Sequence, residues 1–302
     1  MTLSYLLVVL GVVMVSYSGP LVKGALLAGA NPVTVAMLRM AFSVAILLPI
    51  LCIPQGKKKP AIAGLKGITL RQWGWSLAAS LCLALHYVTW MTSLDSTSTF
   101  ASVALVCTQP LFVAAFSGLL LGEHMPRAAV PGALVALVGA LLIGLNSITG
   151  LSGDLGGDLL ALAGAVLMAG HWMCSRYARR EIPAMPYTLL VYVQTALILL
   201  TLTPVLGGIQ VTGTAVWYIL GLAVGCTLLG HMMFTVALGK ISAAVVSFAL
   251  LGEPVGAMVW SMLLFHEIPN ALLVIGGLVV LAGLALYLVG DLRHGKAAER
   301  NG

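Results

Sequence analysis

Residues 242–264 read SAAVVSFALLGEPVGAMVWSMLL, an apolar run that contains a single carboxylate, Glu253, followed at once by Pro254. At about 1.5 Å of rise per helical residue, a run of this length crosses a hydrocarbon core of about 30 Å. Glu253 then lies roughly 16 Å along the helix, near the middle of the bilayer. A charge there costs about 2.5–3.5 kcal/mol to insert. The stretch therefore predicts a membrane-spanning helix, and its central acid is a candidate for a structural or functional role.

Similar apolar runs fill the rest of the chain. Its 302 residues are 60% hydrophobic and 8% charged, whereas soluble domains are about 25% charged. We expect ten spanning helices and no separate soluble domain, which makes the chain an all-α polytopic membrane protein. The expected spans lie near residues 3–22, 33–54, 73–93, 99–121, 129–147, 158–175, 186–206, 214–238, 242–264 and 270–290.

The basic residues indicate how the chain is oriented. If the N-terminus is cytoplasmic, all of the 15 Lys and Arg except Lys23 and Arg39 fall in inner loops or the C-terminal tail. Lys23 falls in an outer loop, and Arg39 lies within a span. The positive-inside rule then places both termini in the cytoplasm of a multi-pass protein of the cell inner membrane. The net charge of +6 is thus an orientation signal, and we expect lipid rather than nucleic acid as the surrounding partner.

The opening stretch has a counterpart in the first half of the chain. TQPLFVAAFSGLLLGEHMP (108–126) aligns with GEPVGAMVWSMLLFHEIP (252–269), placing Pro110 on Pro254. We therefore predict two five-helix repeats, residues 1–150 and residues 151–302, the second ending in a short cytoplasmic tail.

An odd number of helices per repeat means that the second copy enters the membrane inverted relative to the first. The loop charges agree, since equivalent loops are basic in one repeat and lack Lys and Arg, or nearly so, in the other. Inverted repeats are typical of alternating-access transporters, which bind substrate near the midplane where the repeats meet.

The order and doubling of these motifs, with NPVTVAMLRMAFSVAILLP at 31–49, resemble the drug/metabolite transporter superfamily, in particular its ten-helix EamA type. The resemblance covers essentially the whole chain. It implies a central cavity formed by helices one to four and six to nine, with helices five and ten peripheral. It also implies export of small metabolites, including amino acids. The chain departs from a symmetric pattern at Gln109, which precedes Pro110 where the second repeat has Glu253.

Two charged residues within spans are candidates for substrate binding or coupling. Glu253 is either a carboxylate that exchanges protons or binds an amine, or a protonated or hydrogen-bonded acid that fixes a kinked helix. Arg39 either binds a substrate carboxylate or pairs with an acid, or extends along its own aliphatic stem to the outer surface. The prolines Pro110 and Pro254 mark helices that can bend, and we expect hinges there.

Aromatic and histidine side chains extend this set of candidates. His86 and Trp90 are four residues apart on the third helix and so share a face, whereas Tyr87 is expected to point elsewhere. His231 is close to the repeat equivalent of His86, and Gln109 is the counterpart of Glu253. These residues either line the cavity or make interhelical hydrogen bonds and interfacial contacts.

Glycines seven residues apart mark one face of the fifth helix (Gly132, Gly139) and of the tenth (Gly276, Gly283). Such small-residue faces serve either a homodimer contact or packing of each helix on its own repeat, and we favour the second.

Motifs for chemistry are absent from the sequence. It contains no GxxxxGK[ST], no HExxH and no CxxC, so we expect neither an enzyme nor a cofactor or metal site. The favoured function is a secondary transporter that exports a small polar or zwitterionic metabolite, with aromatic or bulky aliphatic amino acids as the leading substrates. Alternatives are a nucleotide-sugar, drug or organic-cation carrier, an importer, and a membrane-embedded enzyme or channel.

Overall fold

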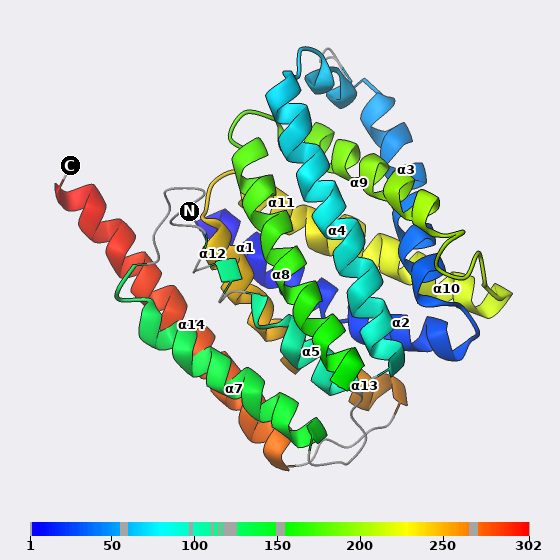
Figure 1. Ribbon diagram of the computed structural model, residues 1–302. Helices are drawn as coiled ribbons and strands as arrows, with labels where there is room; N and C mark the ends of the chain where they lie inside the picture. The colour runs from blue at the N-terminus through cyan, green and yellow to red at the C-terminus, as the bar shows by residue number, and fades with distance from the viewer. Residues whose placement is uncertain are drawn as a thin grey trace.

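The computed structural model describes residues 2–54, 60–96, 99–109, 112–113, 116, 126–148, 155–265 and 271–301, and every regular element among them is helical (Figure 1). The elements are α1 (Thr2–Val15), α2 (Ser18–Leu27), α3 (Pro32–Cys52), η1 (Ala61–Leu65), α4 (Leu70–Ser96), α5 (Thr99–Val106), α7 (Val130–Ile148), α8 (Leu155–Ala178), α9 (Ala184–Leu202), α10 (Gly213–Gly221), η2 (Leu222–His231), α11 (Met232–Ala237), α12 (Ala243–Ala249), η3 (Leu250–Gly252), α13 (Glu253–Phe265) and α14 (Ala271–Asn301).

Six helical runs in these residues are long and apolar enough to cross a membrane. They are Leu3–Leu27, Pro32–Cys52, Leu70–Ser96, Gly156–Ala178, Ala184–Leu202 and Gly213–Ala237. Shorter apolar helices are Val130–Gly139, Leu250–Leu264 and Val274–Tyr287. The prediction of an all-helical, multi-pass membrane protein is confirmed, and the count of ten spans stays a prediction.

One predicted boundary is wrong, and one helix is longer than predicted. The first span continues to Leu27, so Lys23 lies inside α2 rather than in an outer loop, and its Nζ donates to Leu94 O at 3.4 Å. Helix α14 continues to Asn301, so the segment predicted as a short cytoplasmic tail is helical, and its place in the cytoplasm stays a prediction. This segment is rich in Lys, Ala, Glu and Arg, which all favour helix.

Three helical runs are interrupted. The first breaks between α1 and α2 at Ser16 and Tyr17. The run Gly213–Ala237 contains the π-helix η2, and the opening stretch passes through the 3-10 segment η3 before α13. Pro254 is the second residue of α13, a position where its missing N–H leaves no intrahelical bond unmade. Its role as a hinge stays a prediction, and Pro110 lies outside the described residues.

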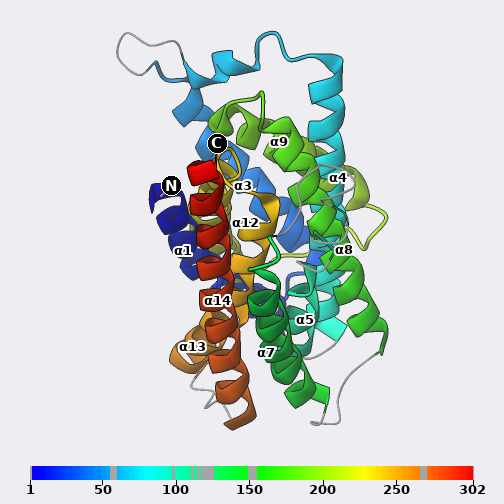
Figure 2. The same cartoon turned by 90° about the vertical axis from the view of Figure 1, so that its left-hand side faces the viewer.

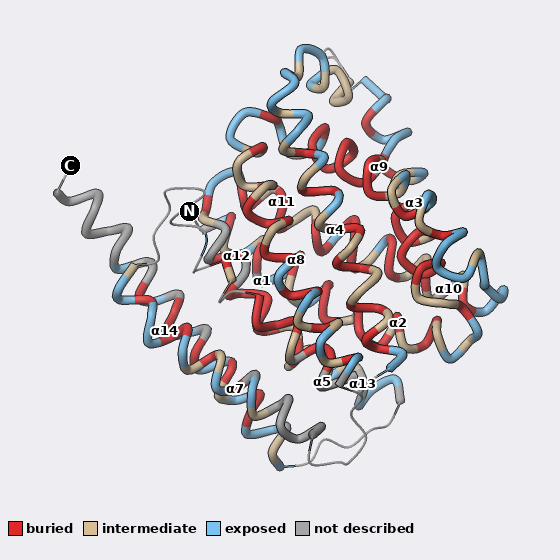
Figure 3. Tube along the Cα trace, in the orientation of Figure 1, coloured by how far each residue is buried: buried red, intermediate tan, exposed pale blue. Residues whose placement is uncertain are grey.

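The bundle is built from helix pairs that join the two halves of the chain. Helix α4 packs on α8, α3 on α9, α1 on η2 and α11, and α7 on α14. Figures 1 and 2 show α7 and α14 side by side along one edge of the molecule. Figure 3 shows exposed residues alternating with buried ones along both helices, and the exposed ones include Leu134, Val138 and Leu278. An apolar outer surface of this kind suits lipid.

The glycine faces of α7 and α14 cover one another. A Cβ on Gly132 would meet backbone atoms of Tyr287 and Gly283, and one on Gly139 would meet Val280 N and Gly276 O. The expectation that each face packs on its own repeat is wrong, because the contact joins the two halves of the chain. Within the described residues, a homodimer therefore has to use another surface.

Candidate functional site

A small cavity lies where the two halves meet. It is lined by Val15, Ser18, Arg39, His86, Tyr87, Trp90, Val106, Gln109, Met168, His231, Leu250 and Glu253. The cavity thus brings together Arg39, His86, Trp90, Gln109, His231 and Glu253, the polar and aromatic candidates chosen from the sequence. Its volume is about 30 Å³, enough for no more than a few water molecules. The described conformation therefore leaves little space between these polar groups.

Arg39 is held inside the bundle rather than reaching the surface. Its side chain is fully buried, its Nε donates to Thr227 Oγ1 at 2.7 Å, and its Nη1 donates to Ser18 Oγ at 3.4 Å. The guanidinium carbon lies 4.6 Å from the centre of the Tyr87 ring. The snorkelling interpretation is excluded for this conformation, because three neighbours fix the head group at the cavity.

Glu253 also faces the cavity but is only partly buried. It begins α13 immediately after the 3-10 segment η3, so the break in the helix directs its side chain inward. Its carboxylate makes no hydrogen bond with any described residue, including Arg39. The cavity therefore contains one cationic and one anionic side chain that are not joined to each other.

Several buried polar atoms around the cavity have no hydrogen-bond partner among the described residues. They include Arg39 Nη2, Trp90 Nε1 and Gln109 Oε1. Leaving a buried donor or acceptor unpaired costs about 1–3 kcal/mol, so groups of this kind call for a ligand or another explanation. Two donors and an acceptor, with the Glu253 carboxylate, can bind a molecule that carries both signs of charge.

Three buried histidines contact neighbouring helices, and two of them, His86 and His231, also line the cavity. His86 Nδ1 lies 3.0 Å from Gly164 O on α8, and His171 Nδ1, on α8, lies 3.0 Å from Ala79 O on α4. These contacts pin the antiparallel pair α4 and α8 at two points. A neutral His86 that donates from Nδ1 retains Nε2 as an acceptor, while its ring stacks on Trp90 at 5.8 Å. His231 stacks instead on Trp172 at 6.0 Å.

The expectation that Tyr87 points away from His86 and Trp90 is wrong. Tyr87 lines the cavity, with the guanidinium of Arg39 over its ring. The reason is that successive helical residues are about 100° apart, so the wall contributed by α4 is wide enough to include both 86 and 87. Sequence reasoning also missed Ser18 and Thr227, the partners of the Arg39 guanidinium. Hydroxyl residues are common in apolar helices, and only the break after Val15 and the π-helix bring these two to Arg39.

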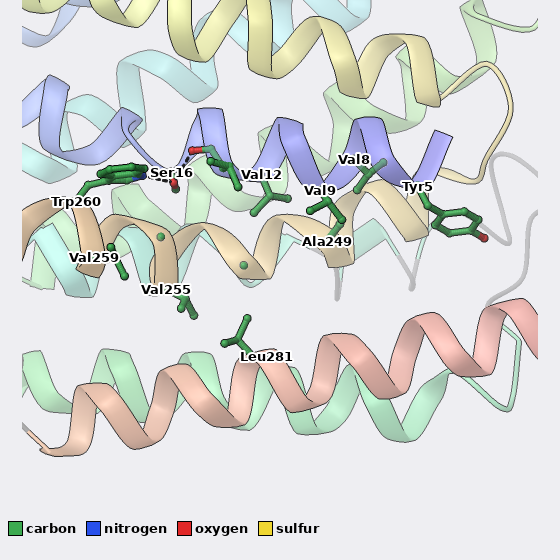
Figure 4. A pocket seen from close by; sticks show the side chains of 13 residues that line it. Tyr5, Val8, Val9, Val12, Ser16, Ala249, Val255, Val259, Trp260 and Leu281 are labelled. Carbon is green, nitrogen blue, oxygen red and sulfur yellow. Dashed lines mark hydrogen bonds between the residues drawn. The ribbon is translucent and has the colours of Figure 1, made fainter. Parts of the chain in front are cut away.

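A larger, apolar groove of about 380 Å³ lies between α1, α13 and α14 (Figure 4). Its walls come from α1, α12, α13 and Leu281 of α14. At one end Trp260 Nε1 donates to Ser16 Oγ at 2.8 Å, and the ring of Trp260 stacks on Tyr17 at 3.7 Å. This contact secures the interruption of the first helical run against α13, next to the residues that line the polar cavity.

Both ends of the bundle are tied by hydrogen bonds. At one end, Asn31 Nδ2 donates to Gly208 O at 3.0 Å and Thr212 Oγ1 donates to Ala28 O at 2.6 Å. At the other, Arg179 Nε donates to Thr235 O at 3.2 Å and Gln72 Nε2 donates to Glu181 Oε2 at 2.6 Å. We refer below to the first set as the Asn31 end and to the second as the Arg179 end.

Comparison with known proteins gives consistent matches. The model of the EamA-like transporter family matches residues 2–145 and again 155–289. Two curated relatives, pseudopaline exporter CntI of Pseudomonas aeruginosa strains UCBPP-PA14 and PAO1, are each 33% identical over 182 residues, 59% of this chain and 62% of theirs. The chain thus matches less than two thirds of the length of these relatives.

Solved structures resemble the chain as well. One crystal structure superposes with a TM-score of 0.73 at 17% sequence identity, covering 95% of this chain and 97% of the other. At this identity the likeness shows the fold alone.

Proposed function

Because the chain belongs to the EamA-like transporter family, and so is a transporter rather than an enzyme, we propose that it exports a small zwitterionic metabolite. Amino acids and related compounds are the leading substrates. Transport proceeds by alternating access, without ATP. The relatives named as pseudopaline exporters support the direction and the metabolite class.

The observation that carries this proposal is the set of unpaired groups in the cavity. Arg39 Nη2 and Trp90 Nε1 are donors suited to a carboxylate, while Gln109 Oε1 and the Glu253 carboxylate accept from an ammonium group. A zwitterion satisfies both sets at once. Among the described residues, Arg39 is the one Lys or Arg that lines the cavity, which disfavours the multiply charged nucleotide sugars.

The packing of the helices supports two inverted repeats, residues 1–150 and 151–302. A two-fold operation that exchanges the halves places Gly132 on Gly276 and Gly139 on Gly283. It therefore converts the contact of Gly132 with Gly283 into that of Gly276 with Gly139, and both contacts are present. The family model matching each half separately points the same way.

The small volume of the cavity and the hydrogen bonds at both ends of the bundle support alternating access. We propose that the Asn31 end faces outward and the Arg179 end faces the cytoplasm of the cell inner membrane, with both termini inside. This orientation follows from the excess of Lys and Arg in the loops assigned to the inner side. Opening at one end then exposes the cavity to one side only.

Glu253 is the proposed coupling group, with Pro254 and Pro110 as hinges. A carboxylate at a helix interruption that lines a central cavity can exchange a proton with each side of the membrane in turn, as that cavity opens to it. His86, which retains a ring nitrogen toward the cavity, and His231 are proposed to complete the site. Partners other than substrate and lipid, including a second copy of the chain, stay predictions.

The test is efflux from liposomes that contain the purified protein and a labelled panel of amino acids, nucleobases and organic cations. We expect efflux of an amino-acid class that rises with an imposed pH gradient, and we expect Glu253→Gln to abolish the dependence on the gradient. Asp95→Asn, which removes an exposed carboxylate at the end of α4, is the matched control and should behave as the unaltered protein.

Each result has a distinct meaning. Gradient dependence that survives Glu253→Gln would assign Glu253 to structure and remove the coupling proposal. Efflux of organic cations or nucleobases alone would replace the zwitterion as substrate. A protein that moves nothing on the panel would contradict the metabolite-exporter function itself.

A further inference from the structure

Three neighbours hold the guanidinium of Arg39, and one of its nitrogens has no partner among the described residues. Its Nε and Nη1 donate to Thr227 and Ser18, and the ring of Tyr87 lies beneath it. The remaining nitrogen, Nη2, is buried and makes no hydrogen bond with a described residue. The flexible side chain is thus already ordered, and the two N–H donors of Nη2 stay available to a ligand in the cavity that Arg39 lines.

Thr227 makes the shortest of these contacts, and its hydroxyl group is oriented by the π-helix. Its Oγ1 donates to Leu222 O at 3.0 Å, five residues earlier, as the wider turns of η2 permit. With its hydrogen used there, the hydroxyl oxygen accepts from Arg39 Nε at 2.7 Å. Tyr192 on α9 fixes the same residue differently, since its hydroxyl donates to Thr227 O at 3.0 Å.

We propose that Thr227 is a positioning residue that aims Arg39 Nη2 at the carboxylate of the transported molecule. Without the Thr227 hydroxyl, Arg39 loses its strongest anchor, and Nη2 no longer has one fixed direction. The inference rests on the proposed function and extends it, because it assigns selectivity for carboxylate-bearing molecules to the π-helix as well as to Arg39.

The substitutions Thr227→Val, Thr227→Ser and Tyr192→Phe separate positioning from folding. Valine keeps the shape of threonine but loses the hydroxyl, whereas serine keeps the hydroxyl. Phenylalanine at 192 removes a bond to the same π-helix without touching Arg39. The probes are leucine and leucinamide, which differ in the carboxylate, and they are measured by efflux and by quenching of tryptophan fluorescence in the purified protein.

We expect Thr227→Val to raise the KM for leucine about tenfold, equivalent to about 1.4 kcal/mol, with an unchanged maximal rate. Leucinamide should bind Thr227→Val as it binds the unaltered protein. Thr227→Ser and Tyr192→Phe should keep the leucine KM within about twofold, a difference well below one hydrogen bond. In an Arg39→Lys background, Thr227→Val should add little, because the group that it positions is gone.

The contrary results differ for the two proposals. If Thr227→Val weakens leucine and leucinamide equally, or if Tyr192→Phe has the same effect, Thr227 is structural and the positioning role is overturned. If the unaltered protein transports another compound on the panel, the same variants are compared with that compound and its amide. If it binds no carboxylate-bearing compound, the zwitterion assignment fails together with this inference.

Discussion

Trp90 shows how an individual side chain can be ready for a ligand. Its ring is buried and stacks on His86, yet its Nε1 is a donor with no partner among the described residues. Trp172 shares these properties except one. It is buried, stacks on His231 and has an unpartnered Nε1, but it does not line the cavity. Comparing Trp90 with Trp172 therefore tests whether an unpaired indole N–H at the cavity binds substrate or is only tolerated in the packing.

We expect Trp90→Phe to raise the KM for the transported compound about 2- to 10-fold, the effect of losing one hydrogen bond of about 0.5–1.5 kcal/mol. The ring and its stacking on His86 are retained, so the maximal rate should change little. Trp172→Phe is the control and should leave the KM unchanged. Equal effects of the two substitutions on KM would remove Trp90 from the binding site.

For individual residues, the sequence predicts which charged side chains line the cavity better than it predicts the uncharged side chains around them. Arg39 and Glu253 stand out because a charge in an apolar run is expensive, so the cavity can be anticipated from them. Tyr87, Ser18 and Thr227 carry no such signal. Their position at the cavity depends on helix interruptions and on which neighbour α4 faces, and these are set by tertiary packing.

The pair α7 and α14 is the clearest contact between elements. Two glycines on each helix allow the backbones to touch, and this accounts for glycine at positions where any Cβ would overlap backbone atoms of the partner. The glycine spacing in the sequence predicts a packing face for each helix. It does not identify the partner helix, because such a face can pack on any helix that also has small residues at the contact.

We expect Gly132→Ala to destabilise the protein by about 1–3 kcal/mol, since a rigid backbone rather than a flexible side chain opposes the added methyl group. Thermal unfolding in detergent, followed by tryptophan fluorescence, measures the change. Gly74→Ala on α4 is the control, because a Cβ there meets nothing within 4 Å. If Gly74→Ala lowers the unfolding temperature as much as Gly132→Ala does, the close backbone contact is not important for stability.

Helix interruptions divide into those with a sequence signal and those without. The 3-10 segment η3 precedes Pro254, a residue that predicts a break. The break at Ser16 and Tyr17 has the same kind of signal, because Pro20 lies four residues later and cannot donate to the Ser16 carbonyl. The π-helix η2 contains no proline, and it arises where Thr227 bonds to Leu222 O and Arg39 bonds to Thr227. Sequence periodicity therefore predicts that these helices exist but not where they change their winding.

Hydrogen bonds among the described residues tie the bundle at both ends, and alternating access requires each end to open separately. Met168 is a suitable reporter, because it lines the cavity, is buried, and can be replaced by cysteine in a variant whose native cysteines are removed. A membrane-impermeant maleimide added to one side then measures access from that side.

We expect Asn31→Ala to increase labelling of Met168→Cys from the outside and Arg179→Ala to increase it from the inside. Loss of about 1 kcal/mol of hydrogen bonding at one end shifts the population of open molecules about fivefold. Without either substitution, labelling should be slow from both sides. Variants that label faster from both sides alike would indicate general loosening and would contradict separate gates.

The contact between α7 and α14 can form only late in the synthesis of the chain. The ribosome finishes α7 at Ile148, but its backbone partner begins only at Ala271. Until α14 emerges, the glycine face of α7 is open to lipid and to other newly made helices in the membrane. A surface formed near the middle of the chain therefore depends on a much later segment for its cover, so a product that stops before α14 leaves the glycine face of α7 without this partner.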